Sequence, residues 1–320
     1  MHPQRAPPKW ICKTTLPPIV KFSNFRAMKN VEYWLVRALF FVFSHISLRW
    51  GKRLALAMTF LVEHIIRYRR QVILDNLQRV YGDQLPKPQK QLLHEIYKHF
   101  VFLWMEFLQS PHLNAQTVQK LMHIKNPEVL QMVRRRESGF IFISGHFGNF
   151  EWLGQAISVM NLPRITAIAK KQSNLKVDAF IVKLRERHGI RIVYTQEAMR
   201  ESEKALHNKE IVAIAFDQDA RHKGVFVDFL GLPSSTAVGT AVLHLRTGAR
   251  IILLIALRKD YAQFDVYLQE IKIPELCGDT DKKIKTITQL CTTEFEKWVR
   301  RYPEQWFWVH KRWKTQPATG

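Results

Sequence analysis

The chain has 320 residues, with 49 Lys and Arg against 27 Asp and Glu, and its formal net charge is therefore +22. Because 47% of the residues are hydrophobic, the chain can bury a large core, which excludes a disordered or low-complexity protein. The three cysteines, Cys12, Cys277 and Cys291, are widely separated and form no CxxC pair. This spacing excludes a disulfide framework and a cysteine-ligated zinc site, and it fits a reducing compartment. The positive charge predicts a polyanionic partner: nucleic acid, an anionic membrane surface, or a phosphorylated or acidic substrate.

The N-terminal part divides into a basic arm and an apolar region. Residues 1–30 are polar, basic and proline-rich, without the pattern of a signal peptide, and are interpreted as a loose arm. Residues 31–66 contain two apolar stretches separated by a basic break and are predicted to be a helical, membrane-associating region. A full membrane span needs about 20 apolar residues, and Arg37 and His45 interrupt the first stretch. A helix in one leaflet, a crossing helix and a buried core helix therefore all stay open, and the basic flanks favour the cytoplasmic side.

The remainder, residues 67–316, is predicted to be one α/β domain. It is helical to about residue 135, where apolar residues recur at spacings of three and four. Short apolar runs then alternate with helical segments up to a last helix at about 282–300, which predicts a mostly parallel central sheet with helices on both faces. The predicted strands are GFIFIS (139–144), RITAIA (164–169), IRIVY (190–194), IVAIAF (211–216) and RIILLIAL (250–257).

The segment SGHFGNFEW, residues 144–152, contains the principal candidate for chemistry. It follows the first of these strands, and ligands of open α/β sheets bind at the carboxyl ends of strands. His146 is a candidate general base, and Glu151, five residues later, could hold its imidazole in one tautomer and stabilise the imidazolium. The alternative is a helix-capping loop with an incidental histidine. The histidines show no metal-ligand spacing, so that neither a metal nor a cofactor is expected.

Four further residues are candidates for substrate binding. Asn149 lies within the same segment, and Asp217 and Asp219 follow the strand at 211–216, again at a carboxyl end. Arg185 could bind a phosphate or an oxyanion, although a solvated surface charge explains it equally well. The C-terminal run PEQWFWVHKRWK, residues 303–314, interleaves aromatic and basic residues, which suits either nucleic acid or a membrane interface.

Several ordered blocks resemble the late acyltransferases of lipid A biosynthesis, a branch of the lysophospholipid acyltransferases. The blocks are RRQVILDNLQRVYGD, SGHFGNFEW, IAFDQDARHKGVFVDFLGLP, TGAR and PEQWFWVHKRWK, and the likeness covers residues 31 to 316. The resemblance implies that His146 and Glu151 form the catalytic dyad of the family, and that Arg185 and Asp217 are functional residues. Arg187 is the alternative to Arg185.

The resemblance also implies a reaction and a location. A fatty acyl chain would pass from acyl carrier protein to a hydroxyacyl hydroxyl of a phosphorylated disaccharide lipid, on the cytoplasmic face of the inner membrane. The partners expected are therefore acyl carrier protein, a phosphorylated lipid acceptor and the membrane, with no nucleic acid, and the protein is expected to be a monomer.

Two other interpretations stay open. In the first, the protein is an acyltransferase for another glycolipid or a lysophospholipid, with acyl-CoA as a possible donor. In the second, it is a basic membrane-binding or nucleic-acid-binding protein without activity, in which His146 is structural. The His146–Glu151 pair separates the enzymes from the binding protein, because binding alone does not need it.

Overall fold

A computed structural model of the protein describes residues 22–187 and 189–318. Residues 1–21 of the predicted arm, with Cys12, lie outside the described residues. From Phe22 the chain is helical, so that a helix begins within the segment interpreted as an arm.

The domain is built on a seven-stranded sheet with the order β1-β9-β8-β2-β5-β3-β4. Every neighbouring pair is parallel except β8–β9, which confirms the predicted α/β class with a mostly parallel sheet. All five predicted strands are present, whereas β1, β9 and a separate β6–β7 hairpin were not predicted. The strands are β1 (Met122–Ile124), β2 (Phe140–Ser144), β3 (Ile165–Ala169), β4 (Ile190–Tyr194), β5 (Ile211–Ala215), β6 (Val225–Phe229), β7 (Leu232–Thr236), β8 (Arg250–Asp260) and β9 (Gln263–Ile271).

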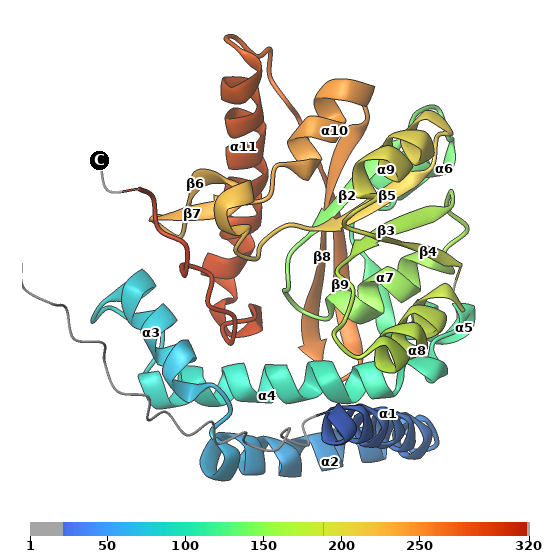
Figure 1. Cartoon of the computed structure of the whole chain (residues 1–320), viewed down its shortest axis with the longest axis vertical. Coiled ribbons are helices and arrows are strands. Elements are labelled where there is room, and N and C mark those ends of the chain that lie inside the picture. Colours follow the sequence, from blue (N-terminus) through green and yellow to red (C-terminus); the bar gives the residue numbers. More distant parts are fainter. Residues whose placement is uncertain (1–21, 188, 319–320) are drawn as a thin grey trace, which may run out of the picture.

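Helices cover both faces of this sheet (Figure 1). The connections through α7 and α8 step along the sheet in one direction, and those through α9 and α10 step back in the other. Because parallel crossovers are right-handed, the two pairs lie on opposite faces. The first pair is α7 (Phe150–Ser158) and α8 (Leu175–Glu186), and the second is α9 (Ala198–His207) and α10 (Gly239–Thr247). Helix α11 (Thr280–Arg301) lies beside the β6–β7 hairpin. The remaining short helices are η2 (Ser110–His112), α5 (Ala115–Leu121), α6 (Pro127–Arg134), η3 (Arg221–Lys223) and η4 (Pro303–Gln305).

The N-terminal helices form a layer below the sheet. Helix α4 (Gln89–Leu108) is largely buried and lies between the sheet and the helices α1 (Phe22–Ser44) and α2 (Leu48–Phe60) (Figure 1). A π-helical turn, η1 (Leu61–Ile66), continues α2 and leads to α3 (Arg70–Tyr81). Within the described ranges, no helix combines the length and the apolar character that crossing a membrane requires.

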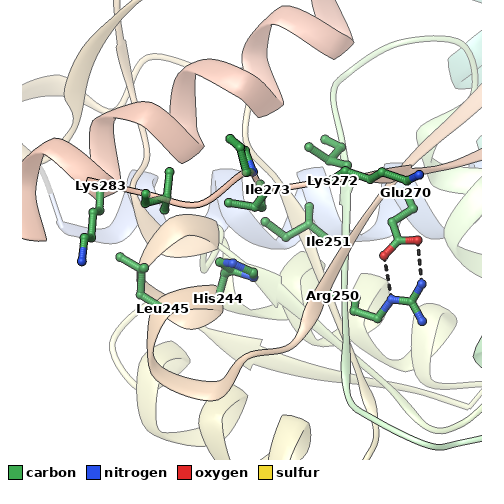
Figure 2. A pocket seen from close by; sticks show the side chains of 11 residues that line it. His244, Leu245, Arg250, Ile251, Glu270, Lys272, Ile273 and Lys283 are labelled. Atoms are coloured by element: carbon green, nitrogen blue, oxygen red, sulfur yellow. Dashed lines mark hydrogen bonds and ion pairs between the residues drawn. The ribbon is translucent and has the colours of Figure 1, made fainter. Parts of the chain in front are cut away.

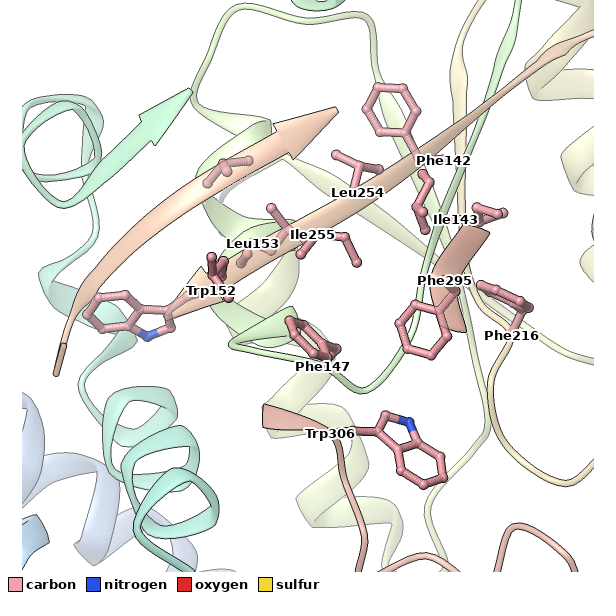
Figure 3. Packing of buried hydrophobic residues seen from close by; sticks show 14 of the residues in the cluster. Phe142, Ile143, Phe147, Trp152, Leu153, Phe216, Leu254, Ile255, Phe295 and Trp306 are labelled. Carbon is pink, nitrogen blue, oxygen red and sulfur yellow. The ribbon is translucent and has the colours of Figure 1, made fainter. Parts of the chain in front are cut away.

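The core lies on both faces of the central strands. Residues 251–257 of β8 are all buried, as expected for a strand covered on two sides. Phe147, Phe216, Phe295 and Trp306 gather beside this strand (Figure 3), and Phe295 contacts both Phe147 and Phe216. The loop that follows β2 therefore packs against large, buried aromatic rings of the core.

Candidate active site

The loop between β2 and α7 has a conformation that depends on two glycines. A Cβ on Gly145 would stand 2.1 Å from the ring of Phe295. Gly148 has φ +56°, and a Cβ there would stand 1.7 Å from the carbonyl oxygen of Ala256. Both positions therefore exclude a side chain, and the backbone of the loop lies directly against the core. His146 lies between these two close approaches.

The imidazole of His146 is held by Asp217, at the end of the neighbouring strand. Strands β2 and β5 pair in register Ser144 with Ala215, so that residues two positions further along each strand meet. Nδ1 of His146 lies 2.7 Å from Oδ1 of Asp217, and the backbone N–H of His146 donates to Oδ2 at 2.8 Å. An ionised carboxylate only accepts hydrogen bonds, so Nδ1 carries the proton and Nε2 is left as the base.

Burial and charge both act on this pair. The imidazole side chain is 19% exposed and the Asp217 side chain 3%. Burial lowers the pKa of His146, but the charge and hydrogen bond of Asp217 outweigh it, and the pKa is raised above its usual value. Burial opposes ionisation of Asp217, yet its bonds to His146 and Trp306 lower its pKa to about 2. The carboxylate is therefore charged at neutral pH.

The C-terminal segment completes the support of the loop. Nε1 of Trp306 donates to Oδ2 of Asp217 at 2.9 Å, and the backbone N–H of Gly148 donates to the carbonyl of Gln305 at 3.0 Å. The side chain of Gln305 bonds to both backbone groups of Arg258 in β8. The sequence alone assigned this block no role in the site; the available signal was Gln305, a polar residue directly before the first tryptophan.

Nε2 of His146 faces the side-chain amide of Gln218, at 3.1 Å from its Nε2 atom. In the neutral tautomer that Asp217 favours, with the proton on Nδ1, Nε2 can accept a hydrogen bond from this amide. Gln218 therefore occupies the position at which a reacting hydroxyl would approach the base. Gln218 was not among the predicted site residues, although it stands between Asp217 and Asp219.

Glu151 lies near His146 but pairs with Arg185. Its Oε1 accepts from Nη2 of Arg185 at 2.6 Å and its Oε2 from Nε at 3.3 Å. Both groups act on His146 through charge, Glu151 raising its pKa and Arg185 lowering it. The structure thus places Glu151 in the site, while Asp217 has the position at Nδ1 that was expected for Glu151. The 71-residue separation of His146 and Asp217 hid this pairing from local spacing.

Asn149 and Asp219 were expected to bind substrate, and the structure gives them other partners. Asn149 is fully buried, which leaves it no surface for a ligand. It caps α7 by accepting from Trp152 N, and it donates to Oε2 of the buried Glu106 at 2.6 Å. Asp219 accepts from Thr315 and from the backbone of Arg221, while its own N–H donates to Nε2 of His310. Both residues shape the loops around the base.

Two further features of the described residues bear on the site. No three His, Cys, Asp or Glu side chains in residues 22–187 and 189–318 are arranged to hold a metal ion. A cavity of about 630 Å³ lies at the opposite edge of the sheet, near the amino end of β8. Its lining includes the Arg250–Glu270 ion pair, Lys272 and Lys283 (Figure 2). The length of β2 separates it from His146, so it is not part of this site.

A mostly parallel sheet with a histidine–carboxylate pair at the carboxyl ends of two central strands defines an α/β protein with a candidate acid–base site. Residues 20–315 match the family described as bacterial lipid A biosynthesis acyltransferase, and the chain belongs to this family. The protein is therefore an enzyme of a family that transfers acyl groups.

Individual relatives are distant but cover most of the chain. The chain is 23% identical to the lipid A biosynthesis palmitoleoyltransferase of Escherichia coli (strain K12), over 79% of this chain and 81% of the relative. It is 22% identical to the lipid A biosynthesis lauroyltransferase of the same organism, over 83% and 85%. It is also 23% identical to the phosphatidylinositol mannoside acyltransferase of Mycobacterium tuberculosis (strain ATCC 25618 / H37Rv), over 74% and 75%.

Proposed function

We propose that the protein transfers a fatty acyl chain from acyl carrier protein to a hydroxyl group of a lipid A precursor, with His146 as the general base. The observation that carries this proposal is the His146–Asp217 pair, which leaves Nε2 of His146 unprotonated at the carboxyl edge of the sheet. The names of the two Escherichia coli relatives support the acceptor. The net charge of +22 supports an acidic carrier protein as the donor.

The reaction needs no protein nucleophile, because the acceptor brings its own hydroxyl. The acceptor hydroxyl replaces the amide of Gln218 at Nε2 of His146. Nε2 then takes the hydroxyl proton while the oxygen attacks the thioester carbonyl. The carbon–sulfur bond then breaks, and the imidazolium returns the proton to the departing thiolate. The charge of Asp217 stabilises the imidazolium between these steps. Arg185, held by Glu151, supplies a positive charge close to the reacting groups.

A row of aromatic contacts links the base to the N-terminal helices. The ring of His146 lies 5.8 Å from that of Phe307, which lies 5.8 Å from Phe100. Phe100 stacks on Tyr68 at 5.3 Å and meets Trp104 edge-on at 6.3 Å. Tyr68 and Trp104 are both exposed. Apolar side chains therefore extend from the base to the surface, which suits substrates that carry acyl chains.

The test is acyl transfer by the purified protein to a lipid A precursor. The same acyl chain is supplied on acyl carrier protein and on coenzyme A, and product is measured by mass spectrometry. We expect turnover with the carrier protein to exceed turnover with coenzyme A at equal concentration. A clear preference for acyl-CoA would contradict the proposed donor, and absence of transfer to the precursor from either donor would contradict the proposed acceptor.

A second acceptor is favoured by one comparison. Because a phosphatidylinositol mannoside acyltransferase matches over 74% of the chain, another glycolipid is the alternative acceptor. Both acceptors present a hydroxyl to the same base, so the mechanism is unchanged. Offering the two lipids in one competition assay, with product masses as the readout, separates them.

We also propose that the N-terminal helices hold the enzyme on the cytoplasmic face of the inner membrane. Among the described residues, all exposed large apolar side chains except Trp104, Leu175 and Leu245 belong to residues 28–68. We call this set the N-terminal apolar face. Most of its members belong to α1 and α2, the layer below the sheet (Figure 1), and the others belong to η1 and the turn that follows it. Its members are Met28, Val31, Trp34, Leu35, Leu39, Phe41, Val42, Trp50, Leu54, Leu56, Met58, Phe60, Leu61, Ile65, Ile66 and Tyr68.

Basic residues accompany this face. Arg37 lies 5.3 Å from the ring of Trp34, and Arg53 lies 4.6 Å from that of Trp50. Apolar insertion and cationic attraction to anionic lipid would therefore act together.

Replacing three residues of this face, Trp34, Phe41 and Phe60, by serine is expected to reduce binding to anionic vesicles at least about tenfold, since each large apolar side chain contributes about 1.5–3 kcal/mol when fully buried. Flotation with vesicles measures the bound fraction. Leu245→Ser, an exposed apolar residue outside the face, is the matched control and should bind like the wild type. Equal binding by the triple variant would contradict the proposal, as would complete release of the wild type by high salt.

A further inference from the structure

A small groove lies between α3 and the C-terminal segment, outside the aromatic row. It has a volume of about 170 Å³, well above the roughly 10–15 Å³ that one water molecule needs. Asp75, Asn76 and Arg79 line it from one face of α3, and Lys311, Trp313 and Lys314 line it from the C-terminal segment. Asn76 donates to the carbonyls of Trp308 and His310 and so joins the two walls.

The charges of the groove favour an anion. Arg79, Lys311 and Lys314 are exposed at its rim, and none of the three has an ion-pair partner within residues 22–187 and 189–318. One carboxylate, Asp75, opposes them and accepts from the amide of Gln71. Three unpaired cations face this single carboxylate, which leaves a net positive site.

Trp313 adds a hydrogen-bond donor without an acceptor. The residue is 5% exposed, and its buried indole Nε1 has no partner among the described residues. A buried donor without an acceptor lowers the stability of the fold unless a ligand or water molecule accepts its hydrogen bond. Trp313 lines the groove, so an anion that enters the groove lies next to this residue.

The groove is also coupled to the catalytic pair. The ring of Trp313 lies 5.9 Å from that of Trp306, and Trp306 donates to Asp217. Lys311 directly follows His310, whose Nε2 accepts from the backbone of Asp219. A ligand group in the groove would therefore lie one layer of side chains away from the loop that carries Asp217.

We propose that this groove binds a phosphate group of the lipid acceptor and so positions its hydroxyl for His146. The proposal rests on the proposed function and adds the group by which the acceptor is recognised. Arg79 can hold two phosphate oxygens with its planar guanidinium, and the two lysines add point charges. The bound phosphate belongs to a lipid, either the acceptor or a phospholipid of the membrane, and the experiment separates these sources.

The test compares the double variant Lys311→Gln/Lys314→Gln and the single variant Arg79→Gln with the wild type. Each is assayed in neutral detergent micelles with the phosphorylated acceptor and with the same acceptor after removal of its phosphates. We expect KM for the phosphorylated acceptor to rise about tenfold or more, with kcat changed little and with no change of KM for the dephosphorylated acceptor. The matched control is Lys272→Gln/Lys283→Gln in the distant cavity, which removes the same charge and should leave both KM values unchanged.

Other results would overturn the proposal. An equal rise of KM for both acceptors would show that the variants impair acceptor binding without regard to phosphate. An equal rise of KM in the control variant would show that the net charge of the protein, and not the groove, attracts the acceptor. Loss of binding to phosphatidylglycerol vesicles with an unchanged KM would assign the groove to membrane phospholipid instead. Equilibrium binding of the two acceptors to the same variants tests the groove without turnover. If the wild type were inactive, the proposed function would be refuted, but phosphate binding in the groove could still be measured by this equilibrium binding.

Discussion

Asp217→Asn is expected to reduce kcat about 10²- to 10⁴-fold, a loss in the range typical of removing the group that orients a catalytic histidine. Oδ2 of Asp217 accepts from both the backbone N–H of His146 and the indole of Trp306, while Oδ1 meets Nδ1. An amide has only one acceptor oxygen. Its NH₂ group must face either two donors or Nδ1, and the second arrangement moves the imidazole proton to Nε2, where it blocks the base.

The pH dependence should change with the rate. In the wild type the charge of Asp217 raises the pKa of His146, so that kcat/KM should increase with pH through a midpoint above the usual value for histidine. Without that charge, burial is the dominant influence and lowers the pKa. The ascending limb of kcat/KM should therefore move to lower pH in Asp217→Asn, while the plateau falls. Initial rates with saturating donor over a pH series measure both changes.

Two further variants serve as comparisons for Asp217→Asn. His146→Ala should lose at least as much activity, because it removes the base itself. Glu151→Gln should leave the ascending limb closer to that of the wild type, since Glu151 pairs with Arg185 and acts on the imidazole only through its charge. If Glu151→Gln produced the larger fall in kcat and the larger shift of the limb, Glu151 would be the functional partner of His146 and Asp217 a structural one.

The contrast between these two carboxylates shows what sequence could predict about the site. His146 was identifiable because it follows an apolar strand and lies between two glycines, a pattern visible within nine residues. Its partner was not, because it depends on which strands are neighbours. Strand β5 lies next to β2 although two other strands intervene in the chain, and only this order brings Asp217 to Nδ1. Glu151, the nearest carboxylate in sequence, was the natural but local inference.

The fold shows the same division. Four of the five predicted strands lie inside the sheet and β4 forms one edge, and all five are short, mainly apolar or β-branched runs, which are easily recognised. Strand β9 alternates buried and more exposed residues, and β1 has only three residues, so neither produces a continuous run. The apolar character of residues 33–66 was evident from the sequence. The basic break within this region was evident too, whereas the start of α2, which Ser47 caps by accepting from the backbone N–H of Trp50, appears only in the structure.

The second large effect is expected beneath the catalytic loop, at Glu106. This residue is fully buried in α4 and forms an ion pair with Arg258 of β8. Its carboxylate also accepts from Asn149 and from the backbone of Ala262. Arg258 donates from Nε to His99. Burial, and then the charge of Arg258, hold the pKa of His99 well below its usual value, against the opposite influence of the nearby Gly148 backbone. This buried network therefore extends to the loop after His146 at two places: Glu106 binds Asn149, and His99 lies near Gly148.

Glu106→Ala should lower the free energy of unfolding by about 3–5 kcal/mol, because it leaves the Arg258 charge buried without its partner. Chemical denaturation in detergent measures this loss. The double variant Glu106→Leu/Arg258→Met removes both charges, and it should recover much of the stability, since apolar replacement of a buried ion pair is often neutral or stabilising.

The double variant also separates stability from positioning. Asn149 loses its Glu106 acceptor and His99 loses its Arg258 donor, so that the loop carrying His146 is less firmly fixed even in a stable protein. We therefore expect kcat of the double variant to stay at least about tenfold below that of the wild type, with the pH midpoint of kcat/KM unchanged because Asp217 is intact. A stable double variant with wild-type kcat would show that the network contributes only to stability. A shifted midpoint would show instead that the network acts on the charge of the His146–Asp217 pair.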